Sequence, residues 1–374
     1  MNEITSENQA NAGQLPNWGR RLVAAVILAV LVLAGAELTV RVEDWVRWST
    51  PLLASSVSVD GLMVSDSTGS HPGPLRVFHK WRINSIGTRG PEPDPILAAR
   101  RVIVLGASET FGLYESPEQE YVRQLSDSLA VMKCSADALN AGFVGMSLPT
   151  VEQDFRLRLA PLKARVTVYY PTPPQYLDDA VPHPVAIRSG ATPVRPAGPA
   201  WRFPGRARDA VKAMLPRFLQ DRIRQRQIAG SRSQYPTDSL FASIPAIRLA
   251  AFDHDLRRLL GTLRTEATIP ILVTHANAFV GTPPAADDRL RAWEKFYPRA
   301  TGATLVAFDS AAAEVVRRIA ADSGVVLVDA WREFRGAPAE KMFADFSHFT
   351  DAGSARMAAL LRPAVARALG CRLP

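Results

Sequence analysis

Short apolar runs recur along the middle and the end of the chain, and β-branched residues are frequent in them. They cover residues 101–105, 138–143, 165–170, 269–274 and 325–328. Continuous apolar runs of this length are typical of strands that are buried on both faces of a parallel sheet. The pattern therefore predicts strands of a parallel sheet at these positions.

Longer segments with helical spacing of their apolar residues separate these runs. They cover residues 118–131, 150–160, 249–266, 310–322 and 352–369. Strands that alternate with helices along a chain indicate the α/β class, a sandwich built on a parallel sheet. In such folds, sites gather at the carboxyl ends of the strands.

One apolar segment near the N-terminus is longer than the others. Two arginines precede the uncharged run of residues 22–36, which Glu37 closes. These residues rise about 22 Å as a helix, and a few more bring the run close to a bilayer core of about 30 Å. We expect a transmembrane signal anchor over residues 22–40. The preceding residues 1–21 form a cytoplasmic tail, because positive charges stay on the cytoplasmic side.

Two other interpretations of this segment stay open. A signal peptide cut after Ala36 fits the small residues Ala34 and Ala36 and makes the protein a secreted one. A buried helix of a soluble domain is the third interpretation, although nothing polar interrupts the run. The anchor places the bulk of the chain in the periplasm, on the outer side of the inner membrane. There, Trp45 and Trp48 suit an interface.

The basic charge of the chain is concentrated in one segment. The formal net charge is +8, yet residues 186–233 contain eleven of the 44 basic residues and two of the 36 acidic ones. The rest is close to neutral, so no nucleic-acid partner is expected. The basic residues from Arg202 to Arg232, with helical character over residues 207–228, fit three interpretations. They are a solvated helix face, contact with anionic lipid, and contact with an acidic glycan.

The cysteines and most histidines suggest no metal site. Cys134 and Cys371 are too few for a disulfide scaffold or a cysteine-rich zinc module. An oxidising compartment permits one bridge between them, and two free thiols are the alternative. Four histidines share no metal-ligand spacing with one another: His71, His79, His183 and His254. We expect neither a metal nor a cofactor.

The candidate chemistry lies in two short segments. Ser108 follows the first predicted strand within Gly-Ala-Ser-Glu-Thr-Phe-Gly, residues 106–112, where a chain turns from strand into helix. A serine hydroxyl needs an adjacent general base before it acts as a nucleophile. Asp345 and His348 supply one, because a carboxylate can hold one imidazole nitrogen while the other faces the serine.

These segments carry a resemblance to a known family. GASETFG and DFSHFTDAG (residues 345–353) resemble the first and last motif blocks of the SGNH, or GDSL-type, hydrolases. The lead-in around residues 84–92 is similar to the membrane-anchored bacterial branch. The resemblance implies a three-layer α/β/α, flavodoxin-like domain and ester hydrolysis or acyl transfer without a metal. It makes Ser108 the nucleophile, His348 the general base and Asp345 its orienting acid.

The family's oxyanion hole is matched in part. Residues 140–145, Asn-Ala-Gly-Phe-Val-Gly, resemble the second block, which makes the N–H of Gly145 a donor beside that of Ser108, with Gly142 as the rival glycine. The third block of the family has an asparagine that is missing from residues 169–175, where Thr172 or Gln175 is the alternative. Ala107 also replaces the family's usual aspartate.

A further histidine follows the fourth predicted strand. His275 and Asn277 come directly after residues 269–274, so they are candidates for lining the same cleft. The alternative is an ordinary capped loop.

The sequence thus predicts four regions: the tail, the anchor, an extracytoplasmic lead-in over residues 41–96, and a hydrolase-like domain over residues 97–370 with a basic insert at about 180–240. The predicted function is a serine esterase or O-acyltransferase that forms an acyl-enzyme on acyl groups, such as acetyl, of a surface carbohydrate. The alternative is a catalytically weakened protein of the same fold that binds glycans or assembles polysaccharide.

Overall fold

The computed structural model describes residues 17–53, 59–66, 68–178, 201–281 and 287–372. Most of the predicted cytoplasmic tail, His183 and the first part of the predicted insert lie outside these ranges.

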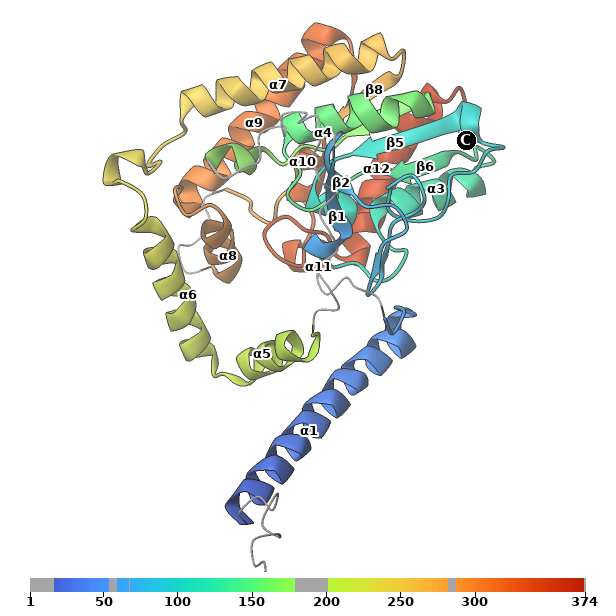
Figure 1. Ribbon diagram of the computed structural model, residues 1–374. Helices are drawn as coiled ribbons and strands as arrows, with labels where there is room; N and C mark the ends of the chain where they lie inside the picture. Colours follow the sequence, from blue (N-terminus) through green and yellow to red (C-terminus); the bar gives the residue numbers. More distant parts are fainter. Residues whose placement is uncertain (1–16, 54–58, 67, 179–200, 282–286, 373–374) are drawn as a thin grey trace, which may run out of the picture.

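A five-stranded parallel sheet forms the centre of the fold (Figure 1). Its strands are β5 (Arg101–Leu105), β6 (Asp137–Asn140), β7 (Val166–Tyr169), β8 (Ile269–Val273) and β9 (Val326–Val328). The spatial order is β6-β5-β7-β8-β9, with every neighbouring pair parallel. The predicted strands are confirmed. The order reverses between β5 and β7, the place in such a sheet where ligands bind.

Helices cover both faces of the sheet, which confirms the three-layer arrangement. On β5, Val102 and Val104 point to one face and Ile103 and Leu105 to the other, as alternation along a strand requires. The first face packs against α3 (Tyr121–Val131) and α12 (Asp351–Ala368), and the second against α4 (Leu148–Asp154), α7 (Ala246–Thr265) and α9 (Gly302–Ser323). Apolar side chains therefore fill two cores, one on each side of the sheet.

Shorter elements complete the domain. The remaining short helices are α2 (Ser108–Phe111), α8 (Asp288–Phe296), α10 (Ala330–Arg335) and α11 (Ala339–Met342). A π-helical turn (Phe155–Leu159) extends α4. The 3-10 turns are Asp60–Leu62, Ala98–Arg100, Ala160–Leu162, Pro173–Leu177 and Thr237–Ser239.

The lead-in contains two small hairpins that the sequence pattern did not predict. They pair β1 (Met63–Asp66) with β2 (Gly69–Pro72) and β3 (Val77–Phe78) with β4 (Trp81–Arg82). Strands this short give almost no periodic signal, so only their turn-forming residues are visible in the sequence.

The N-terminal apolar segment lies within one continuous helix, α1 (Asn17–Trp48). It is near the N-terminus, is almost entirely exposed, and is long and apolar enough to cross a membrane (Figure 1). The helix runs on beyond Glu37 and includes Trp45 and Trp48.

The described part of the basic insert forms two helices where the sequence indicated one helical stretch. They are α5 (Phe203–Met214) and α6 (Arg217–Arg232), separated at Pro216, whose ring and missing N–H end a helix. The start of α5 is fastened to α1 (Figure 1): the carboxylate of Glu37 accepts hydrogen bonds from the backbone N–H groups of Arg202 and Phe203.

A second carboxylate on α1 completes this attachment. Asp44 is fully buried and forms ion pairs with Arg202 (2.9 Å) and Arg206 (2.8 Å). It also contacts His79 Nε2 at 3.2 Å. Arg202 and Arg206, at the start of the described part of the insert, therefore bind an acidic residue of this chain.

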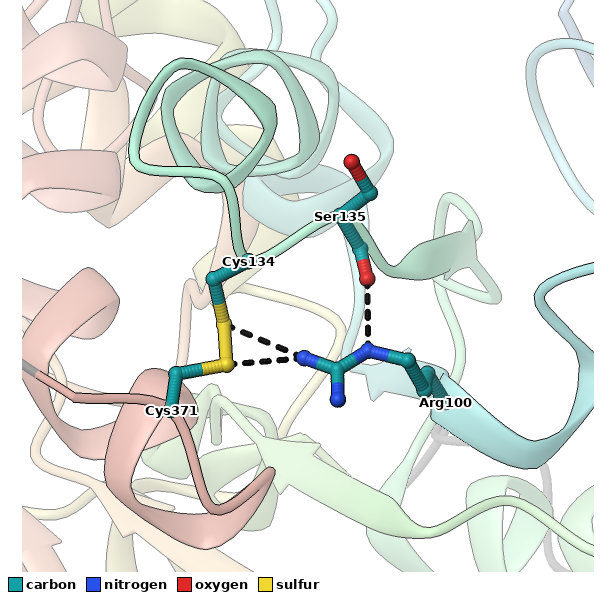
Figure 2. The surroundings of a disulfide bond; sticks show 4 residues. All are labelled: Arg100, Cys134, Ser135 and Cys371. Atoms are coloured by element: carbon teal, nitrogen blue, oxygen red, sulfur yellow. Dashed lines mark hydrogen bonds between the residues drawn. A yellow bond between two sulfur atoms is a disulfide. The ribbon is translucent and has the colours of Figure 1, made fainter.

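Cys134 and Cys371 are joined by a disulfide (Figure 2). It connects the chain just after α3 to the chain just after α12, two helices on the same face of the sheet. The guanidinium of Arg100 points at both sulfur atoms and donates to Ser135 O at 2.8 Å. Of the two alternatives for the cysteines, the structure has the bridge.

Candidate active site

The backbone at the end of β5 presents Ser108. Gly106 leaves the strand, and a Cβ there would lie 2.0 Å from Thr110 Oγ1, so only glycine fits this turn. Helix α2 begins at Ser108, and the Ser108 side chain is partly exposed. The turn therefore places a hydroxyl at the carboxyl end of the sheet, beside its topological switch point.

The C-terminal segment brings a histidine and a carboxylate to this serine. His348 Nε2 lies 2.8 Å from Ser108 Oγ, and His348 Nδ1 lies 2.8 Å from Asp345 Oδ2. Asp345 Oδ1 also accepts the backbone N–H groups of Ser347 and His348, at 3.0 and 2.9 Å. The loop is held by these bonds, so the imidazole has a fixed orientation toward Ser108.

The surroundings of His348 favour its protonated form. Burial lowers its pKa, but the hydrogen bond to Asp345 and the negative charges of Glu109 and Asp345 outweigh this, and the net pKa is raised above the ordinary value. An imidazole with a raised pKa is a stronger base toward a hydroxyl proton. The ring of Tyr114, an exposed residue, meets the imidazole edge-on at 5.5 Å.

The backbone N–H groups of the two residues expected to form the oxyanion hole, Ser108 and Gly145, are open. Among the described residues, none accepts a hydrogen bond from the N–H of Ser108 or of Gly145. Gly145 is exposed and has a positive φ of 76°. The rival Gly142 differs, because its N–H donates to Asn140 Oδ1 at 3.1 Å. Of the two glycines, Gly145 is the one that offers a free donor.

The segment without the family's asparagine is engaged internally. Thr172 donates its hydroxyl to Glu109 Oε2 at 2.9 Å. Gln175 is buried in a 3-10 turn, and its N–H donates to Thr172 O. Of the two sequence-predicted substitutes for the asparagine, Thr172 thus has its hydroxyl engaged within the protein and Gln175 its backbone N–H.

Glu109 is a part of the site that the sequence did not reveal. It follows Ser108, is 2% exposed, and its Oε2 lies 3.4 Å from Ser108 Oγ. Its Oε1 accepts the hydroxyl of Ser347 at 2.9 Å. Burial raises the pKa of Glu109, but contact with His275 and the charges of both histidines hold it well below its ordinary value.

A second histidine–carboxylate pair stands behind Glu109. His275 Nε2 lies 3.6 Å from Glu109 Oε1, and His275 Nδ1 lies 2.7 Å from Asp309 Oδ1. Asn277 donates to Asp309 Oδ2 at 2.5 Å. Burial lowers the pKa of His275, but the two carboxylates raise it to about 10. His275 is therefore a cation in the interior, placed behind the site by the end of β8.

The described residues contain no cluster of three or more His, Cys, Asp or Glu side chains arranged to hold a metal ion. A hydroxyl, a base that can take its proton, and two open N–H groups suit attack on an ester carbonyl.

Comparison with known proteins yields structural neighbours only. No family model matches the chain, and no curated protein matches it. One similar solved structure is a lipase/acylhydrolase from Enterococcus faecalis, 14% identical, covering 72% of this chain and 96% of that one, with a TM-score of 0.42. Another is an acetylxylan esterase from Geobacillus stearothermophilus in a catalytic mutant form. It is 14% identical, covers 73% of this chain and 95% of that one, and has a TM-score of 0.41.

A third is a GDSL-like lipase from Bacteroides thetaiotaomicron, 12% identical, covering 74% of this chain and 93% of that one, with a TM-score of 0.40. These neighbours are lipases, acylhydrolases and acetylxylan esterases. At such identities and TM-scores the likeness carries no weight for the chemistry of this chain, which depends on the distances given above.

Proposed function

We propose that this protein is a serine esterase or O-acyltransferase that forms an acyl-enzyme on Ser108. The observation that carries the proposal is the alignment of Asp345, His348 and Ser108 through two contacts of 2.8 Å. This is the order in which an orienting acid, a base and a nucleophile must stand. The residues that make it are those of the motifs GASETFG and DFSHFTDAG.

The reaction would proceed in two halves. His348 Nε2 takes the proton of Ser108 Oγ as the oxygen attacks the ester carbonyl, and the N–H groups of Ser108 and Gly145 stabilise the oxyanion. His348 then gives the proton to the leaving alcohol, and the acyl group stays on Ser108. Water completes a hydrolysis and a sugar hydroxyl completes a transfer, in each case with His348 as the base again.

The substrate class we propose is an acylated carbohydrate at the cell surface, with acetyl as the acyl group. The compartment is the basis for this. Helix α1 is suited to anchor the chain in the inner membrane, and the Cys134–Cys371 disulfide fits an oxidising environment outside the cytoplasm. Acylated polysaccharides are ester-rich substrates found in that compartment.

One observation favours a second function, a weakened glycan-binding protein of the same fold. The segment that should supply a third oxyanion donor binds Glu109 through Thr172, and Pro171, Pro173 and Pro174 have no N–H to give. Loss of one such donor costs about 2.7–4 kcal/mol of transition-state stabilisation. A site that lacks this donor would turn over ester slowly or not at all.

Turnover of p-nitrophenyl acetate decides between the two functions. The full chain in an uncharged detergent should release nitrophenol and gain one acetyl group by intact mass, and Ser108→Ala should do neither. If the wild type and Ser108→Ala release nitrophenol at equal rates and the wild type gains no acetyl group, the esterase function is wrong and the glycan-binding function is favoured.

A further inference from the structure

A cavity of about 350 Å³ lies between the end of α1 and the domain. Cations dominate its wall: Arg47, Lys80, Arg82, Arg89 and Arg123, against the carboxylates Glu118 and Glu120. Trp48 contributes an aromatic surface, and its ring stacks on His79. The cavity is separate from Ser108, and neither the motifs nor the proposed mechanism uses it.

Part of this positive charge is neutralised within the protein. Arg89 and Glu120 form a buried pair at 3.0 Å. Arg47 contacts Glu43 at 3.0 Å and Arg123 contacts Asp127 at 3.3 Å, both as exposed pairs along their own helices. Exposed pairs of this kind bind weakly and leave the cations available to a ligand.

Lys80 and Arg82 are different, because each donates to a main-chain carbonyl. Lys80 donates to Glu115 O, and Arg82 donates to Trp48 O at 3.2 Å. Within the described ranges, no carboxylate lies within ion-pair distance of either side chain. Burial and the charge of Arg89 lower the pKa of Lys80 to about 8. The cavity therefore holds cations that an incoming anion would stabilise.

The position of the cavity along α1 bears on whether its anion comes from a lipid headgroup or from a soluble polymer. Arg47 lies eleven residues beyond Ala36, the end of the apolar run, or roughly 16 Å along a helix. Measured from Val40, the distance is still roughly 10 Å. The headgroup layer adds only about 5–7 Å to the hydrocarbon core on each side. With α1 upright in a bilayer and its apolar run filling the hydrocarbon core, the cavity would stand beyond the lipid phosphates, where a soluble polymer reaches it.

We propose that this cavity binds an acidic sugar residue, one that carries a carboxylate or a phosphate group. Arginine and lysine are the side chains that hold such groups, and an aromatic wall suits the apolar face of a sugar ring. One residue of the cavity wall, Arg89, also donates to Phe111 O and Gly112 O at the end of α2, the helix that Ser108 begins. In assigning an anionic carbohydrate to the enzyme, the inference rests on the proposed function.

Binding to the full chain carrying Ser108→Ala tests the inference without turnover. In an uncharged detergent, calorimetry should show binding of trigalacturonate or glucose 6-phosphate that weakens with added salt, and no binding of uncharged xylotriose. Arg82→Gln and Lys80→Gln should each weaken binding about tenfold, the loss expected for one charge-assisted hydrogen bond. Arg82→Lys should retain most of the affinity.

A matched control is Arg264→Gln. Arg264 is also exposed and also donates to a main-chain carbonyl, that of Ser323, and its loss changes the net charge equally. If Arg264→Gln binds the acidic probes with unchanged affinity, the result supports binding in the cavity. Equal affinities of wild type and Arg82→Gln, no binding of either acidic probe, or Arg82-dependent binding to phosphatidylglycerol vesicles alone would overturn the inference. Turnover of p-nitrophenyl acetate tests the esterase proposal and does not depend on these binding results. Failure of the esterase proposal can therefore be distinguished from failure of the acidic-sugar proposal.

Discussion

Glu109 accepts a hydrogen bond from the hydroxyl of Ser347 at 2.9 Å, and this contact joins the two halves of the candidate site. Glu109 follows Ser108 in sequence, and Ser347 precedes His348. The bond therefore ties the backbone that carries the serine to the backbone that carries the histidine. Both partners are almost fully buried, so competition from water is small.

The charge of Glu109 leads to a prediction about pH. Glu109 and Asp345 together raise the pKa of His348, and the base must be neutral to accept a proton. Replacing Glu109 by Gln removes one negative charge, so the pKa of His348 should fall. The acidic limb of kcat/KM for p-nitrophenyl acetate should consequently move to lower pH.

The control for this variant is Glu314→Gln, which removes an exposed carboxylate on α9. Its pH profile should coincide with that of the wild type. A purely structural role for Glu109 would lower activity at every pH and leave the limb in place, and that result would contradict the prediction.

Stability should also depend on His275. Its pKa is raised to about 10 in the folded protein, against about 6.5 for an exposed histidine. A group with a raised pKa stabilises the fold fully below its unfolded pKa and loses this contribution as pH rises through the folded value. The unfolding temperature of the wild type should therefore fall between pH 7 and pH 10.

His275→Gln should be less stable than the wild type at pH 7 and should show a flatter dependence over the same interval. His254→Gln replaces an exposed histidine on α7 and should reproduce the wild-type curve. If His275→Gln and wild type lose stability in parallel as pH rises, the buried cation is not the cause.

The sequence predicted the sheet because most of its strands lie in short apolar runs, which burial on both faces of the sheet requires. Val104 and Ile271 lie in such runs, and their fully buried positions explain why no polar residue interrupts them. The insert contains Pro216, a residue type that ends helices, but the two separate helices there are known only from the structure.

The site was predictable where a residue follows a strand or lies in a motif. Ser108 and His348 were indicated by their chemistry and by resemblance, although 240 positions separate them, and His275 was indicated by its place after a strand. Glu109 and Asp309 could not be found this way, because their meaning depends on contacts between distant segments. One signal was available: Asp309 stands among the apolar positions of α9 and is fully buried, and a lone carboxylate in a core helix needs a partner.

The disulfide should contribute strongly to stability. It closes a loop of 237 residues, and removal of a native bridge typically costs about 2–5 kcal/mol. Cys371→Ser, or the wild type with dithiothreitol, should lower the denaturant midpoint of unfolding. Reductant should have no further effect on Cys371→Ser. An unchanged wild-type midpoint under reducing conditions would show that the bridge does not stabilise the fold.

The anchor can be tested by fractionation and N-terminal sequencing. If α1 spans the membrane, the mature protein keeps Met1 and remains with membranes washed with carbonate. A mature chain that begins at Glu37 would establish a cleaved signal peptide instead. The two arginines before residue 22 supply a control, since replacing both by Glu should disturb orientation while the apolar run stays intact.

The last prediction concerns the three aligned residues. Ser108→Ala and His348→Ala should each lower kcat for p-nitrophenyl acetate by roughly four to six orders of magnitude, and the double variant should lose no more than either alone, because the residues act as a unit. Asp345→Asn should lose less, roughly 10³- to 10⁴-fold, since it disturbs the imidazole tautomer while Ser108 and His348 remain. The rate of nitrophenol release, corrected for the rate without protein, measures each loss. Additive losses in the double variant would mean that Ser108 and His348 do not share one proton transfer, and the 2.8 Å contact between them would then have no catalytic meaning.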